Sequence, residues 1–100
     1  MTTSDTNEWT LTDGERRLTF RGRMLASVTS NDGTPEKEQW YSDLDLYQTT
    51  KGTFVAVRST VRHGERRTSW LVSRKETEVQ EWLGYGALSL ELYEDAGWSI

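Results

Sequence analysis

The sequence contains no cysteine, one histidine and one proline in 100 residues. Without thiols, the chain can form neither disulfides nor a cysteine-ligated metal site, and it has no thiol nucleophile. The only imidazole is that of His63. The sequence has no nucleophile-elbow serine with which His63 could form a catalytic site, and no Asp-rich loop of the calcium-binding type. We therefore expect no enzyme activity, no cofactor and no metal, and we interpret His63 in "HGER" as turn chemistry.

Long apolar runs are also missing. No stretch approaches the roughly 20 apolar residues that span a bilayer. The start, "MTTSDTNEW", lacks the basic head and the apolar core of a secretion signal. The sequence therefore predicts a soluble, cytoplasmic protein without membrane contact. Apolar residues make up 34% of the chain and charged residues 28%, a balance typical of a folded domain.

Basic residues are absent from the last quarter of the chain. Residues 76–100 hold six acidic residues and no base, whereas residues 1–75 hold all twelve Lys and Arg. The C-terminal segment is therefore a distinct acidic element. The net charge of −4 argues against general nucleic-acid binding, although a local basic patch can still contact phosphates.

Apolar and polar residues alternate along the first three quarters of the chain, which is the pattern of half-buried strands. Short turns at "DG", "KG" and "GE" favour an antiparallel meander, and the one longer loop contains Pro35. From residue 75 the apolar residues recur at helical spacing, and Gly84 and Gly97 are natural stops. The sequence predicts strands over 8–12, 16–29, 39–50, 53–63 and 66–74, and helices over 75–84 and 87–97.

These elements predict one α+β domain over residues 8–100, preceded by a disordered N-terminus over residues 1–7. The domain is a five-stranded antiparallel β-meander with two C-terminal α-helices packed on one face, because an apolar sheet face needs a cover. The expected apolar sheet face consists of Leu18, Phe20, Met24, Val28, Leu44, Leu46, Val55, Val57, Val61, Trp70 and Val72. The expected cover consists of Val79, Trp82, Leu83, Leu88 and Leu92, with Trp98 and Ile100 docked on the core.

The expected β-turn also predicts how charges pair across the strands. A two-residue turn at 51–52 would set Asp45 opposite Arg58. Arg21 and Arg23 would then lie near the aspartates of the third strand. Opposite charges on neighbouring strands stabilise a sheet, so the arginine row is expected to be a solvated, cross-paired face.

The first candidate surface is the tyrosine and aspartate row of the third predicted strand. Tyrosine beside charge suits a protein interface. Tyrosines on a sheet face equally support neighbouring strands by packing, and both interpretations stay open. The candidate protein interface consists of Tyr41, Asp43, Asp45 and Tyr47.

The second candidate surface is a basic patch, because residues 58–75 hold six basic residues and one acid. Such a patch can contact phosphates while aromatic rings stack on bases. Its arginines can equally face water, or meet the acidic C-terminal segment within the protein or in a dimer. The basic patch consists of Arg58, Arg62, His63, Arg66, Arg67, Arg74 and Lys75.

Two motifs, "FRGRMLAS" at 20–27 and "LYQTTKGTFVAVRS" at 46–59, resemble a group of small uncharacterised actinobacterial proteins of the EXLDI type. Those proteins are similar in having an F-x-G-R-L-L strand followed by a Y-x-T-x-K-G-x-F-V hairpin. This chain ends in "DAGWSI" and lacks the C-terminal EXLDI motif. The resemblance implies a bacterial protein without an assigned activity, and it supplies no functional residues.

The size, the aromatic content and the split between basic and acidic segments predict a non-enzymatic protein-interaction module. Such an accessory or inhibitor protein would dock on a larger partner or on a second copy of itself. One alternative is a nucleic-acid-binding accessory protein that uses the basic patch. Another is an acidic inhibitor of a nucleic-acid-binding protein.

Overall fold

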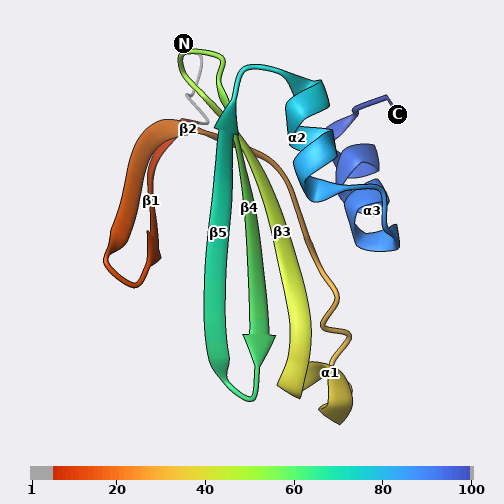
Figure 1. The fold of residues 1–100 in the computed structure, drawn as a ribbon. Helices are drawn as coiled ribbons and strands as arrows, with labels where there is room; N and C mark the ends of the chain where they lie inside the picture. Colours follow the sequence, from red (N-terminus) through yellow and green to blue (C-terminus); the bar gives the residue numbers. More distant parts are fainter. Residues whose placement is uncertain (1–5, 100) are drawn as a thin grey trace.

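The computed structural model describes residues 6–99 and has the α+β fold expected from the sequence (Figure 1). Five strands come first and two helices follow them, with a further short helix before the third strand. The strands are β1 (Asn7–Asp13), β2 (Arg16–Thr29), β3 (Trp40–Thr49), β4 (Phe54–Arg62) and β5 (Glu65–Ser73). The helices are α1 (Pro35–Gln39), α2 (Glu76–Leu83) and α3 (Ala87–Ala96).

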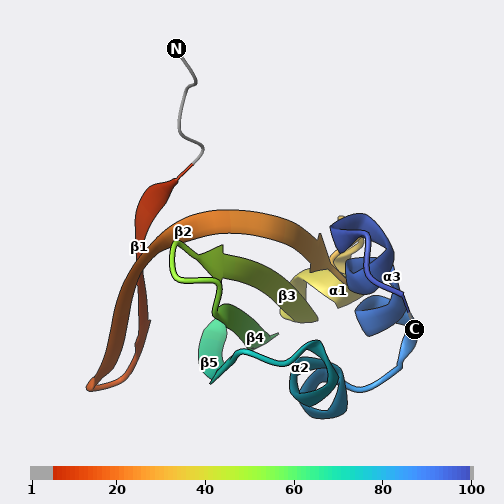
Figure 2. The same ribbon diagram turned by 90° about the horizontal axis from the view of Figure 1, so that it is seen from above.

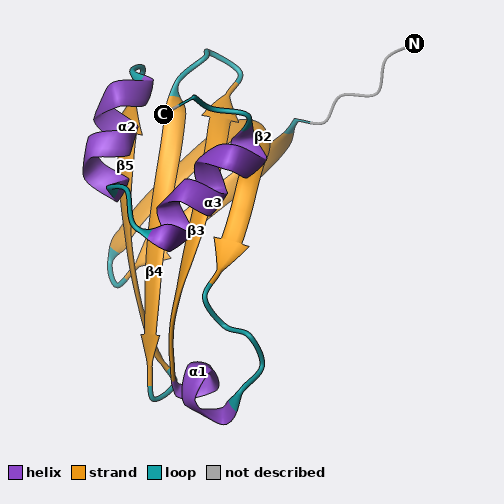
Figure 3. Ribbon diagram, turned by 90° about the vertical axis from the view of Figure 1, so that its right-hand side faces the viewer, coloured by secondary structure: helices purple, strands orange, loops and turns teal. Residues whose placement is uncertain are grey.

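The strands form a single antiparallel sheet in chain order, β1-β2-β3-β4-β5, as the short turns predict. The helices α2 and α3 lie side by side over one face of this sheet (Figure 3). Helix α1 interrupts the predicted loop around Pro35. Most of the expected disordered start falls on residues 1–5, outside the described residues, whereas Asn7 already belongs to β1. No helix in the described part of the chain is long and apolar enough to cross a membrane.

The sheet curls because β2 changes partner along its length (Figure 2). The first half of β2 pairs with β1 up to Asn7↔Gly22, and the second half pairs with β3 from Gly22↔Thr49 onward. The curl brings the β1–β2 hairpin toward β5, where the Asp13 carboxylate accepts a hydrogen bond from the backbone N–H of Thr68 at 3.4 Å. One sheet therefore encloses apolar side chains on both of its faces.

The main core lies between the sheet and the helices, as expected. Val79, Leu83 and Leu92 are buried there, and Trp82 and Leu88 pack against them, so the predicted cover is confirmed. Trp98 docks on this core, with its ring centroid 5.0 Å from that of Phe54. Ile100 lies outside the described residues. The buried members of this core are Ala26, Val28, Leu44, Leu46, Phe54, Ala56, Val79, Leu83, Leu92 and Tyr93.

A second apolar cluster lies on the opposite face of the sheet. Its buried centre is Tyr47, Val55 and Val57. The curled β1–β2 hairpin supplies much of its cover. The side chains packed around that centre are Trp9, Leu11, Leu18, Phe20 and Trp70.

The connection between β3 and β4 is one residue longer than predicted. Thr49, rather than Thr50, pairs with Thr53, and the Thr49 N–H donates to the Thr53 carbonyl at 2.7 Å. Residues 50–52 form a three-residue loop that ends at Gly52, with φ of 85°. A left-handed residue at the end of such a loop is a recognised hairpin solution, and glycine adopts it at low cost.

This loop makes the predicted β3–β4 register wrong by one residue. Asp45 pairs with Val57 and Tyr41 with Val61, so neither stands opposite an arginine of β4. A one-residue slip moves every side chain of a strand to the other face. The strand residues that therefore lie away from the helices, contrary to the prediction, are Val55, Val57, Val61, Trp70 and Val72.

A bulge in β2 produces a second error of the same kind. Met24 pairs with Tyr47, yet Ala26 pairs with Leu46, so the side chains of β2 change face between these positions. Val28 lies beneath the helices as predicted. The residues of β2 that lie instead on the Tyr47 side are Leu18, Phe20 and Met24.

The β4–β5 turn consists of His63 and Gly64, with φ of 48° and 82°. Two left-handed residues are what a tight two-residue hairpin requires. The structure thus confirms His63 as a turn residue. Arg62 pairs with Glu65 across this turn, and Arg67 pairs with Thr60.

Gly22 gives the first testable prediction, because it lies where β2 passes from β1 to β3. A Cβ at this position would meet the Gln48 carbonyl and stand 2.8 Å from the Thr49 Cα. Overpacking against backbone cannot be relieved by a rotamer change, so Gly22→Ala should lower the free energy of unfolding by at least about 2 kcal/mol in urea titration. Gly86→Ala, where a Cβ meets open space, is the control and should cost under about 1 kcal/mol. Equal effects of the two variants would contradict the close approach.

Candidate functional site: an acidic groove

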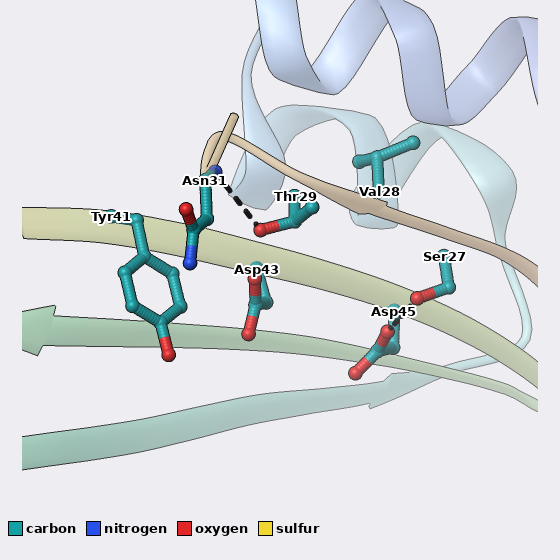
Figure 4. A pocket seen from close by; sticks show the side chains of 7 residues that line it. All are labelled: Ser27, Val28, Thr29, Asn31, Tyr41, Asp43 and Asp45. Carbon is teal, nitrogen blue, oxygen red and sulfur yellow. Dashed lines mark hydrogen bonds between the residues drawn. The ribbon is translucent and has the colours of Figure 1, made fainter. Parts of the chain in front are cut away.

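The polar row of β3 lines a shallow depression on the face away from the helices (Figure 4). Tyr41, Asp43 and Asp45 point to this side at alternate positions, as strand geometry requires. Ser27 pairs with Asp45, and Thr29 pairs with Asp43, from the neighbouring strand β2. We call this depression of about 400 Å³ the acidic groove, and its lining is Ser27, Val28, Thr29, Asn31, Tyr41, Asp43 and Asp45.

Asp45 is the partly buried carboxylate of the groove. Its Oδ1 accepts a hydrogen bond of 2.6 Å from the Ser27 hydroxyl. Burial raises the pKa of Asp45, and the nearby Asp43 adds to the rise, while the Ser27 hydrogen bond and Arg66 oppose it. A carboxylate with a raised pKa holds a charge that its surroundings only partly compensate.

Asp43 has a cationic partner in Arg66 of β5. The guanidinium Nη1 lies 3.2 Å from Asp43 Oδ2, and Nη2 lies 3.4 Å from the Tyr41 hydroxyl. The Arg66 side chain is 48% exposed, and exposed ion pairs contribute about 0–1 kcal/mol to stability. Arg66 can therefore leave the pair at small cost when another cation enters the groove.

The predicted arginine partners of this acidic row are wrong. Arg23 pairs with Gln48, and the residues opposite the two aspartates are Ser27 and Thr29. The bulge shifts the register by only one residue, so most of the error lies in the overall register of β2 against β3. A connection that contains α1, rather than a tight turn, joins these strands and leaves their register open in the sequence. Uncharged hydroxyl groups thus replace the expected arginines on this side of the groove.

Tyr47 was expected at the surface and is instead buried, with 4% of the residue's surface accessible. Its ring centroid lies 4.8 Å from that of Trp9 and 5.2 Å from that of Phe20. Burial, with a contribution from the charge of Asp45, raises the pKa of Tyr47 to about 12. Tyr47 therefore belongs to the second apolar cluster, and of the predicted interface only Tyr41, Asp43 and Asp45 line the groove.

The groove borders an open strand edge. Pairing between β1 and β2 ends at Gly22, so among the described residues no strand pairs with the outer edge of β2 beyond it. The Ser30 N–H donates inward to the Ser42 carbonyl at 2.9 Å. Backbone groups alternate sides along a strand, which directs those of Ser27 and Thr29 to the free edge. Both residues are exposed.

The basic patch does not form one surface. Arg58 lies under the helices, where its Nη2 donates to the Trp82 carbonyl at 2.6 Å and its guanidinium is 4.6 Å from the indole centroid. Arg66 binds the acidic groove on the other face. Arg74 and Lys75 follow the end of β5, and Arg74 lies roughly 26 Å along the strand from Arg66. The expectation of a single basic surface is therefore wrong.

Three members of the patch lie together near the β4–β5 turn. Arg62 and Arg67 point to the helix side of the sheet beyond the helices, and His63 forms the turn. The Trp40 ring joins them, with the Arg62 guanidinium 4.6 Å from its centroid. Its indole N–H donates to His63 Nε2 at 3.1 Å. The sequence interpretation missed Trp40, whose partners become visible only once the turn is placed at His63.

Comparison with known proteins assigns no role to either surface: no protein-family model matches the chain, and no curated protein or solved structure matches it. The resemblance to EXLDI-type proteins stays a prediction from two short motifs. Within residues 6–99, no group of three or more His, Asp or Glu side chains is placed to hold a metal ion. What the acidic groove offers chemically is two carboxylates framed by hydroxyl and amide groups, which suits a cationic side chain.

The second testable prediction separates the two tyrosines. Tyr47→Ala should lower the free energy of unfolding by about 3–5 kcal/mol, because it removes a buried ring and leaves a cavity. Tyr41→Ala should cost about 1 kcal/mol or less, because its ring lies at the surface of the groove. Urea titration followed by tryptophan fluorescence measures both. A Tyr47→Ala variant as stable as Tyr41→Ala would show that the second cluster is not a core.

Proposed function

We propose that the protein is a non-enzymatic protein-interaction module that binds a basic side chain of a larger partner in the acidic groove. The observation that carries this proposal is the state of Asp45, a partly buried carboxylate whose close polar contact is a hydroxyl group. A guanidinium or ammonium group from a partner would supply the missing positive charge. Charge-assisted hydrogen bonds of this kind are stronger than those between neutral groups.

The open edge of β2 supports an extended partner segment. A strand added beside Ser27 and Thr29 would gain main-chain hydrogen bonds from this edge. Alternate side chains of that segment would point to the groove face, where Asp45 and Asp43 lie. Main-chain pairing would supply affinity, and the carboxylates would select a basic residue at one position.

The charge of the groove argues against phosphate ligands at this place. Two carboxylates repel a nucleic-acid backbone, so nucleic-acid binding would need the arginines near the β4–β5 turn instead. An acidic inhibitor of a nucleic-acid-binding protein would be a special case of the proposal. The basic side chain bound in the groove would then be one that the partner otherwise uses to bind phosphate. The captured molecule distinguishes the two alternatives from the proposal. Nucleic acid would support the first alternative, and a nucleic-acid-binding protein would support the second.

The third testable prediction uses Asp45→Asn, which keeps an oxygen for the Ser27 hydroxyl and removes the charge. Losing a hydrogen bond to a charged group costs about 1.5–3 kcal/mol, so the affinity for a captured partner should fall roughly 10-fold to 100-fold. Affinity capture with the tagged full chain, in the presence of nuclease, identifies the partner, and calorimetry then compares the variants. Glu8→Gln on exposed β1 is the control and should bind like the wild type.

The same variant should make the protein more stable at neutral pH. Because the pKa of Asp45 is raised on folding, its contribution to stability is present at low pH and is lost as the pH rises through the folded-state pKa. Asparagine does not ionise, so the Asp45→Asn variant does not lose this stability as the pH rises. The free energy of unfolding of the variant should therefore exceed that of the wild type at pH 7. A variant that keeps full partner affinity, whatever its stability, would contradict the proposed binding role.

A further inference from the structure

The helices cover only one end of their sheet face. Figures 1 and 3 show α2 and α3 beside the end of the sheet near the β3–β4 loop, whereas β3, β4 and β5 continue past them to the β4–β5 turn. The uncovered end holds a depression of about 540 Å³ lined by Thr60, Arg62, Glu65 and Arg67. Together with Trp40, which pairs with Arg62, we call this surface the bare face.

The bare face carries the residue types that interfaces use. Trp40 is 51% exposed, although it is a large aromatic side chain on a sheet. Arg62 stacks on its ring, and His63 accepts its indole N–H, so the tryptophan is held in place before any partner arrives. Within the described residues, neither Arg62 nor Arg67 forms an ion pair. Tryptophan and arginine are the residues that most often dominate binding energy at interfaces.

The outer surface of the helix layer has the opposite charge. Glu91, Glu94 and Asp95 of α3 are exposed, and their spacing places them along one stripe of the helix. Glu81 of α2 is exposed as well. No base accompanies these acids from residue 76 to the end of the chain. We call these four residues the acidic helix surface.

We propose that the protein forms a two-fold symmetric dimer in which the bare face of each copy receives the acidic helix surface of the other. Each copy has a step on one side of its sheet. The step is raised at the end covered by α2 and α3 by about one helix diameter, roughly 10 Å, and is lower at the other end, where the short helix α1 lies beside β3 (Figures 1 and 3). Two such steps nest when one copy is turned through 180°, and each contact is then made twice. The occupant of the bare face is a second copy of the chain. The acidic helix surface of that copy has the charge opposite to that of the bare face, and its raised helix layer fits the low end of the step.

The aromatic residues at the borders of the two surfaces fit the same arrangement. Tyr85 lies in the loop between α2 and α3 and is 57% exposed. In the nested dimer this loop approaches the β-strands of the partner copy near the border of its bare face. Trp40, at the other border of the bare face, contacts the helix layer of the partner copy at the end away from that loop. The contact thus has aromatic side chains at both ends and opposite charges between them, which is the composition of a specific interface.

A charge exchange tests the dimer directly. Arg62→Glu with Arg67→Glu reverses the bare face, and Glu91→Lys with Glu94→Lys reverses the acidic helix surface. Each double variant alone would place like charges against each other in both contacts, so its dimer dissociation constant should rise at least 100-fold, by about 2.7 kcal/mol or more. An equimolar mixture of the two double variants should recover a dimer, because both of its contacts then join opposite charges.

Sedimentation equilibrium of the full chain measures the result against a monomer mass of 11.6 kDa. The control is Arg17→Glu with Arg21→Glu, two exposed arginines of β2 outside both surfaces, which should leave the dimer intact. Recovery in the mixture excludes misfolding as the cause of dissociation, since unfolded chains could not complement each other.

Three outcomes would overturn the proposal. The first is a wild-type mass of one chain up to the highest soluble concentration. The second is a dimer that persists in either double variant, or a mixture that stays monomeric. The third is nucleic acid that sediments with the wild type and is lost with Arg62→Glu and Arg67→Glu, which would assign the bare face to phosphates. None of these results depends on Asp45, so the dimer and the acidic groove can fail separately.

Discussion

The hydrogen bond from the Thr49 N–H to the Thr53 carbonyl is the constraint on which the rest of the structure depends. It closes a three-residue loop and thereby sets the register of β3 against β4, the two central strands. In that register Leu46 and Ala56 face the helices, whereas Tyr47 and Val55 face the opposite side. A sheet with apolar residues on both faces needs two covers. Helices α2 and α3 supply one cover, and the curled β1–β2 hairpin supplies much of the other.

Both covers leave polar surface near the β4–β5 turn. On the face away from the helices this surface is the acidic groove, where Asp45 stands at the border between polar and apolar side chains. On the helix side it is the bare face, where Arg62 and Trp40 are stacked in the open. The two surfaces carry opposite charge and lie on opposite faces of the sheet, so they suit different partners. The proposed binding of a basic segment and the proposed pairing of two copies therefore do not compete for the same residues.

Sequence patterns were sufficient for the order and type of the main elements, because alternation and helical spacing depend only on neighbours along the chain. They predicted the helix side chains Val79, Leu83 and Leu92 as core for the same reason. The register was beyond them, because "TTKGT" is compatible with a two-residue or a three-residue loop. The bulge after Met24 was also beyond them, because a bulge is defined by the partner strand rather than by its own residues. The burial of Tyr47 and the hydroxyl partners of the aspartates follow from these two features. The division of the basic patch follows instead from strand alternation, because Arg66 pairs with Val61 and therefore lies on the opposite face from Arg58.

The most direct test of this account is the pairing of β3 with β4, observed by nuclear Overhauser effects between Hα protons. Because Thr49 and Thr53 form a hydrogen-bonded pair, alternation makes Leu46 and Ala56 a non-hydrogen-bonded pair, in which the two Cα atoms are only about 4.5 Å apart. The three-residue loop at 50–52 predicts a strong cross-peak between the Hα protons of Leu46 and Ala56. A cross-peak between Leu46 and Val57 in its place would mean the two-residue turn. That result would exchange the two faces of β4 relative to β3, and it would remove both the acidic groove and the bare face as described.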